Sequence, residues 1–176
     1  MKYNYYIGIQ IPAPLRQKIQ QLQSELFDPI ECVEPLEPHI TLLPPPCVGD
    51  INPDHLSLHV KAAAESGLPF DVSLTDVVTF KGRTVAFKAE SSTLHDLQQQ
   101  LVELLPFEAD EVEYFPEPKF TPHITLVQAL RGRTLPAKLV QEYKAAARKL
   151  LPASFTVDHL TLFERERPRK YRAKPI

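Results

Sequence analysis

The chain has 176 residues, of which 43% are hydrophobic and 24% charged, with a net charge of −2. This length and composition predict one globular domain with a sizeable core. The near-neutral charge excludes a general attraction to nucleic acid or to anionic membranes, and no apolar run is long enough to span a bilayer.

The first half of the chain predicts five elements. Residues 5–11 alternate weakly, as in a first strand rather than a signal peptide. Residues 14–27 have apolar residues at helical spacing. A loop follows, and then a strand-like five-residue motif, the word PHITL at Pro38–Leu42. A second helix is expected from about 52 to 66, stopped by Gly67, and then a strand over 70–80.

The second half repeats that order after a tight turn at 81–83. A strand (84–89), a helix from Ser91 or Ser92 to Leu105, the word Pro122–Leu126, a helix (136–151) and a closing strand from Phe155 are expected. We therefore predict a single domain over 1–176, with repeat halves at roughly 1–80 and 81–165 and a basic C-terminal tail at 166–176. Such halves indicate two similar lobes related by a pseudo-twofold axis.

The word PHITL occurs twice, with its histidines 84 residues apart. Alternate residues of a strand share a face, so His39 and Thr41 are expected to face a cleft while Ile40 and Leu42 anchor the strand. The same holds for His123 and Thr125. Together the two words predict one symmetric site with two imidazoles and two hydroxyls.

This group of side chains suits the cleavage of a phosphoester. One histidine can remove a proton from the attacking oxygen while the other gives a proton to the leaving oxygen. Threonine hydroxyls can donate to the non-bridging phosphate oxygens, and the scheme uses neither a metal nor a cofactor. The alternative is that each histidine is only a strand-end residue bonded to a neighbour, which identical words at matching points of a repeat disfavour.

Because of these two His-x-Thr-Leu motifs, the chain resembles the two-histidine (2H) phosphoesterase superfamily, in its 2′-5′ RNA ligase-like (LigT-like) branch. The resemblance extends from the opening YYIGIQIP to the closing FTVDHLTLFE. It implies an α+β, bilobal LigT-like fold, in which two lobes, each with an antiparallel sheet and helices, surround a central cleft.

The resemblance also implies the activity and the catalytic residues. The expected enzyme is a metal-independent phosphodiesterase acting on a nucleotide or RNA with a 2′,3′-cyclic phosphate or a 2′-5′ linkage. His39, Thr41, His123 and Thr125 would be catalytic, with His123 as the base and His39 as the acid, although a near-symmetric site exchanges these roles when the reaction runs backwards. The alternative is a module of the same fold that binds a nucleotide or an RNA end without turnover.

One position departs from the family. Many relatives have an arginine in the pattern HxTLxR, where this chain has Gln128. The uncharged Gln128 cannot make the phosphate contact of that arginine, and this departure disfavours a long RNA substrate. Tyr6 and Arg131, one of the nearest arginines after the motif, are the expected substrate-binding residues.

The other histidines have less distinctive settings. His159 and Thr161 form a third His-x-Thr-Leu, but the matching strand of the first half has no histidine, so we expect an ordinary strand histidine. His55 and His59 lack an acidic third ligand at a zinc-site spacing and are expected on a solvated helix face.

The remaining expectations concern the setting of the protein. The basic run from Arg165 to Lys174 is expected to be a solvated, poorly ordered tail, although it could contact a polyanion or an acidic loop at 108–113. Two cysteines outside any metal or redox spacing indicate a cytoplasmic protein. We expect a monomer without a membrane partner.

Overall fold

The structure is a computed structural model of the chain, and the parts that it describes are residues 5–44, 52–65, 67–104, 120–167 and 170–176. The acidic loop expected at 108–113 lies outside these ranges. Within them, no helix combines the length and the apolar character needed to cross a membrane.

The elements follow the predicted repeat. The first half forms β1 (Tyr5–Gln10), α1 (Ala13–Leu26), β2 (His39–Leu43), α3 (Pro53–Glu65) and β3 (Phe70–Phe80). The second half forms β4 (Thr84–Glu90), α4 (Ser92–Leu104), β5 (His123–Gln128), α6 (Ala137–Arg148), β6 (Ala153–Val157), β7 (Thr161–Arg167) and β8 (Lys170–Pro175). The second half thus ends in three strands where one was expected.

All eight strands form one antiparallel sheet in the order β6-β3-β4-β5-β2-β1-β7-β8. It consists of two groups of four strands, which meet where β5 lies beside β2. The described residues form a single bridge at this boundary, between Ile40 and Ile124. The predicted α+β class with two pseudo-twofold-related lobes is confirmed.

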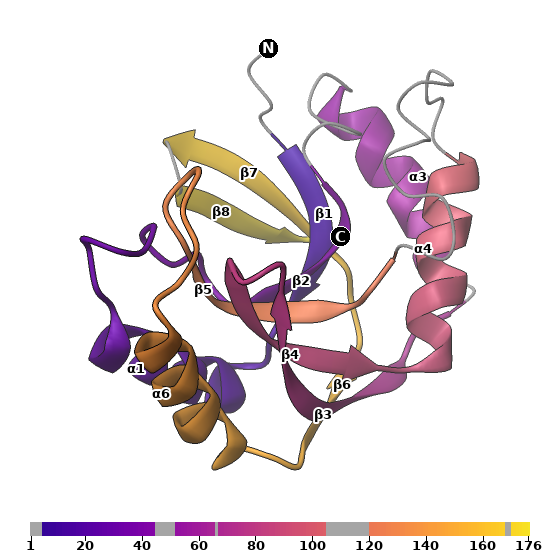
Figure 1. Cartoon of the computed structure of the whole chain (residues 1–176). Helices are drawn as coiled ribbons and strands as arrows, with labels where there is room; N and C mark the ends of the chain where they lie inside the picture. Colours follow the sequence, from indigo (N-terminus) through magenta and orange to yellow (C-terminus); the bar gives the residue numbers. More distant parts are fainter. Residues whose placement is uncertain (1–4, 45–51, 66, 105–119, 168–169) are drawn as a thin grey trace.

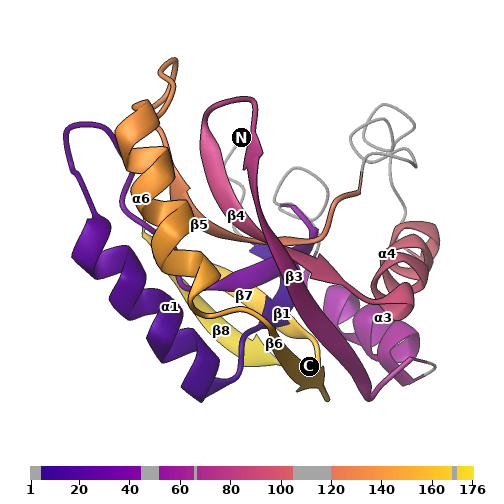
Figure 2. The same ribbon diagram turned by 60° about the horizontal axis from the view of Figure 1, so that its bottom comes forward.

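Each lobe contains elements from both halves of the sequence. The strand that ends the first half, β3, pairs with β4 of the second half, and β7 returns to pair with β1. The helices cross over in the same way, since α1 packs against α6 and α3 against α4. Figures 1 and 2 show these helix pairs on opposite sides of the sheet. The two lobes are therefore interleaved by the chain.

The closing strand predicted from Phe155 onwards is instead two strands in different lobes. β6 pairs with β3, whereas β7 pairs with β1. Residues 158–160 between them have neither helical nor strand structure, which lets the chain pass from one lobe to the other. Apolar periodicity cannot reveal this break, because both parts keep the alternation of a strand.

The expectation of a poorly ordered C-terminal tail is wrong. Lys170–Pro175 form β8, the edge strand, which pairs with β7. Arg172 forms an ion pair with Glu164, and Lys170 Nζ lies 3.8 Å from Glu166 Oε2. Charged side chains along an edge strand discourage pairing with other chains. The same high density of charge is typical of a solvated tail, so the sequence did not reveal the strand.

Gly8 allows β1 to pass close to β2. A Cβ atom at this position would lie 2.4 Å from the carbonyl oxygen of Ile40 and 3.3 Å from the ring of Phe163. The first contact is with backbone that is part of the bridge to β5, so it cannot be relieved by moving a side chain. The absence of a side chain at Gly8 is therefore part of what positions β2.

We expect Gly8→Ala to lower the free energy of unfolding by about 1–3 kcal/mol, the usual range for an overpacked core. Gly67→Ala is the matched control, since the nearest atom that its Cβ would meet among the described residues is Thr93 Cγ2, at an ordinary contact distance of 3.7 Å. Urea unfolding of both variants measures the difference. Equal stability of the two variants would contradict the close approach of β1 and β2.

Candidate active site

The two PHITL words lie in β2 and β5, the central strands of the sheet. Ile40, Leu42, Ile124 and Leu126 are completely buried, whereas the histidine and threonine of each word remain partly exposed. The predicted alternation is confirmed: the apolar residues anchor each strand, and the polar residues share its other face.

The register of β2 and β5 brings the two words together. Because Ile40 lies opposite Ile124 in an antiparallel pair, His39 falls opposite Thr125 and Thr41 opposite His123. His39, Thr41 and Thr125 line one cavity, and His123 is close enough for its charge to act on His39. The four polar side chains therefore form one group.

Each imidazole is held by the same kind of hydrogen bond. His39 Nδ1 lies 2.7 Å from the carbonyl oxygen of Glu37, and His123 Nδ1 lies 2.8 Å from that of Thr121. A carbonyl oxygen can only accept, so Nδ1 must carry the hydrogen. In the neutral ring, Nε2 is then left with a free lone pair that can accept a proton.

His39 has a strongly perturbed environment. The pKa of His39 is lowered to about 4, mainly by burial and to a smaller extent by the positive charge of His123. The hydrogen bond to the Glu37 carbonyl acts in the opposite direction. His39 is consequently neutral at physiological pH and can accept a proton.

Aromatic side chains enclose His39. Tyr6 stacks on Phe163 with ring centroids 4.5 Å apart and planes 5° apart, and the ring of His39 lies 5.0 Å from Tyr6 and 5.3 Å from Phe163. Tyr6 is only 4% exposed, and burial raises the pKa of its hydroxyl, which stays protonated. Expected as a substrate-binding residue, Tyr6 in this structure packs against the catalytic candidate itself.

The surroundings of His123 are related by the pseudo-symmetry but differ in detail. Phe80 lies opposite Thr84 on β4, as Phe163 lies opposite Tyr6 on β1. The Phe80 ring is 4.9 Å from that of His123. A threonine thus takes the place that the tyrosine ring has on the other side, and His123 has fewer aromatic neighbours among the described residues.

A cavity of about 170 Å³ opens beside three of the four side chains. His39, Thr41 and Thr125 line it together with Gln23, Glu37 and Gln128. The chain from Cys32 into β2 is paired with the chain from β5 to Ala129 at two points, the Cys32–Ala129 pair and the Ile40–Ile124 bridge. The cavity lies between these two points, where the two segments are not paired. The amide of the buried Gln23 spans this gap, with Nε2 3.3 Å from the Thr125 carbonyl and 3.5 Å from that of Leu36.

Arg131 is not among the residues that line this cavity. It is exposed in the turn after β5, whereas Gln128, at the position of the family arginine, contributes to the cavity wall. A contact of Arg131 with substrate remains a prediction. Sequence periodicity offered no signal for Gln23, because a buried polar residue on an amphipathic helix has the spacing of the apolar residues around it.

The third His-x-Thr-Leu differs from the other two. His159 lies in the connection between β6 and β7, which corrects its expected place in a strand, and its Nδ1 is 2.5 Å from Asp158 Oδ1. Thr161 is completely buried in β7, opposite Gly8. The structure thus separates this pair from the group formed by β2 and β5.

The described residues contain no group of three or more His, Cys, Asp or Glu side chains arranged to hold a metal ion. His55 is exposed on α3, in agreement with the expected solvated helix face.

Comparison with known proteins identifies the family. The profile of the 2′-5′ RNA ligase superfamily matches residues 11–169, and the chain therefore belongs to this superfamily. The resemblance to the two-histidine phosphoesterases inferred from the PHITL words is confirmed. A search of curated proteins gave no match.

Several solved structures share the fold. Escherichia coli LigT complexed with 3′-AMP is 18% identical with a TM-score of 0.59, and the LigT complex with ATP is 18% identical with a TM-score of 0.61. The protein TT0787 of Thermus thermophilus is 19% identical with a TM-score of 0.64. Each alignment covers 98% of this chain and 94% of the other. At these identities the likeness establishes the LigT fold.

The lowered pKa of His39 predicts how stability depends on pH. Between pH 6.5 and about 4, an unfolded histidine binds a proton that native His39 does not bind. Acidification through this window therefore favours the unfolded state. We expect the wild type to lose more stability than His39→Gln between pH 7 and pH 5, as measured by urea unfolding at both pH values.

His55→Gln, which removes an exposed histidine, is the control for this comparison. An equal loss of stability in the wild type and in His39→Gln would show that His39 titrates as an exposed histidine does.

Proposed function

We propose that the protein is a metal-independent phosphodiesterase that acts on nucleotides or RNA with a 2′,3′-cyclic phosphate or a 2′-5′ linkage. The observation that carries this proposal is the pair of imidazoles on one face of the sheet. Each is fixed through Nδ1 by a backbone carbonyl and keeps Nε2 for chemistry, and the threonines of the same two strands, Thr41 and Thr125, line one cavity with His39.

The substrate class draws support from the relatives. Structures of LigT, which has this fold, were solved with 3′-AMP and with ATP. A ribose with adjacent hydroxyls is the chemical basis of both a 2′,3′-cyclic phosphate and a 2′-5′ linkage. The cavity beside His39 has the neutral amides of Gln23 and Gln128 in its wall, which suits an uncharged part of a nucleotide better than a second phosphate.

The proposed reaction is an acid–base hydrolysis. Water attacks phosphorus while one imidazole takes its proton, and the other imidazole gives a proton to the ribose oxygen that leaves. The hydroxyls of Thr41 and Thr125 donate to the non-bridging oxygens and stabilise the negative charge that grows there. Exchange of one proton with solvent then restores both histidines.

We assign the base to His39 and the acid to His123. The family resemblance implied the reverse, but a base must be unprotonated before the reaction, and burial keeps His39 in this state. The negative charge of a bound phosphate raises the pKa of a nearby imidazole, which strengthens His39 as a base when the substrate is in place.

We also propose that the protein works as a cytoplasmic monomer. The buried Cys32 is a free thiol, as expected in a reducing compartment.

The histidines should act as a unit. We expect His39→Ala and His123→Ala each to lower turnover of 2′,3′-cyclic nucleotides on the order of 10²–10⁴-fold, the usual effect of losing a general acid or base. The double variant should lose much less than the product of these factors, because both groups serve one transition state. Hydrolysis is measured in EDTA, since no proposed step needs a metal.

His159→Ala serves as the control and should retain wild-type turnover. Nucleotide binding without turnover in the wild type would instead indicate the non-catalytic binding module. Loss of all turnover in EDTA, with recovery on addition of a divalent ion, would contradict the metal-independent mechanism.

A further inference from the structure

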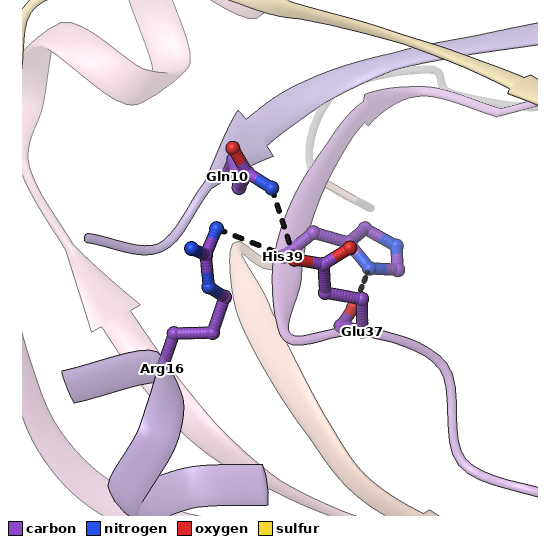
Figure 3. A network of polar contacts seen from close by, with 4 residues as sticks. All are labelled: Gln10, Arg16, Glu37 and His39. Carbon is purple, nitrogen blue, oxygen red and sulfur yellow. Dashed lines mark hydrogen bonds and ion pairs between the residues drawn. The ribbon is translucent and has the colours of Figure 1, made fainter. Parts of the chain in front are cut away.

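A polar network lies beside His39, and the reaction scheme makes no use of it (Figure 3). The Oε1 atom of Glu37 accepts a hydrogen bond from Gln10 Nε2 at 2.9 Å. The same oxygen lies 3.2 Å from a guanidinium nitrogen of Arg16. Glu37, in the segment before β2, is thus held at once by the last residue of β1 and by the first turn of α1.

Glu37 is also the residue whose backbone carbonyl accepts the hydrogen bond from His39 Nδ1, at 2.7 Å. Its carboxylate and its carbonyl belong to one residue, so holding the carboxylate limits how far the carbonyl can turn or move. Figure 3 shows both contacts, with the imidazole on the side of Glu37 away from Arg16. The network is therefore connected to the imidazole through Glu37.

We propose that Arg16 and Gln10 are positioning residues that fix the orientation and the tautomer of His39 through Glu37. The proposal rests on the role of His39 as a proton acceptor in the function proposed above. A base must present Nε2 without a hydrogen, and the carbonyl at Nδ1 enforces this tautomer only while it stays in place.

The location of Glu37 explains why such support is needed. The segment between Val33 and Pro38 has no helical or strand structure, so its backbone is not fixed by a ladder of hydrogen bonds. Arg16 and Glu37 have side chains that are 24% and 36% exposed, and partial shielding from solvent makes their ion pair stronger than one on an open surface. Groups held on a strand and a helix are more precisely placed than groups held on a loop alone.

The other histidine lacks a matching arrangement in the described structure. Lys88 lies opposite His123 in the register, as Gln10 lies opposite His39. Thr121, whose carbonyl holds His123, corresponds to Glu37. However, Lys88 Nζ forms its ion pair with Glu90 Oε1 of its own strand, at 2.5 Å, and not with the segment that contains Thr121. Among the described residues, the pseudo-symmetry therefore supplies the carbonyl contact at both histidines but the network at His39 alone.

Arg16→Met tests the proposal, because it removes the charge and keeps much of the apolar stem. We expect kcat to fall on the order of 10-fold or more, as for a misplaced catalytic group, with little change in KM, since Arg16 does not line the cavity. The ring ¹⁵N spectrum of His39 should change from one tautomer, protonated at Nδ1, to a mixture. Arg16→Lys should restore part of both properties.

Lys18→Met is the matched control, because it removes one positive charge from an exposed position on the same helix. It should leave kcat and the His39 spectrum as in the wild type. In a double-mutant cycle, Arg16→Met should have no further effect once Glu37 is replaced by alanine, because Arg16 acts through Glu37. Thermal unfolding of each variant verifies that it is folded, and Gln10→Leu offers a second way to weaken the network.

The two measurements separate this proposal from the proposed function. An unchanged His39 spectrum in folded Arg16→Met and Gln10→Leu would overturn the positioning role, whatever their activity. A changed spectrum in a protein whose wild type hydrolyses no nucleotide would support the positioning role and overturn the function.

Discussion

The arrangement of the whole site depends on the pairing of β2 with β5 at Ile40 and Ile124. This bridge fixes which residues of the two strands face each other. A slip of either strand by one residue would turn its own histidine and threonine to the opposite face of the sheet, away from those of the other strand. The four completely buried apolar residues of the two words make such a slip costly, so the hydrophobic half of PHITL sets the geometry of its polar half.

The scaffold places two equal groups in related positions and then makes their surroundings unequal. Both histidines bond through Nδ1 to the carbonyl two residues before them. On one side, Tyr6 and Phe163 stack and shield His39, which lowers its pKa. On the other side, Thr84 stands where the tyrosine would be. Environments that differ around two titratable groups are a common way to divide acid and base roles.

Much of this arrangement could be predicted from the sequence, because it is encoded in the repeated PHITL motif and in the local periodicity of apolar residues. The repeat predicted the two lobes, and the spacing of His39 and Thr41 predicted their common face. The exchange of β3 and β7 between the lobes was not predicted, since strand pairing over long distances leaves no mark on local periodicity. The contacts of Glu37 were also missed, because Gln10 and Arg16 approach it only in the folded chain.

The most direct test of the account is a crystal structure with a bound 2′- or 3′-nucleotide monophosphate. The account predicts that Nε2 of His39 and Nε2 of His123 both lie within about 3.2 Å of oxygens of the same phosphate, with the hydroxyls of Thr41 and Thr125 on its remaining oxygens. A phosphate bound away from the β2–β5 face would contradict the account. So would imidazoles more than about 10 Å apart, too far to hold one phosphate through direct hydrogen bonds.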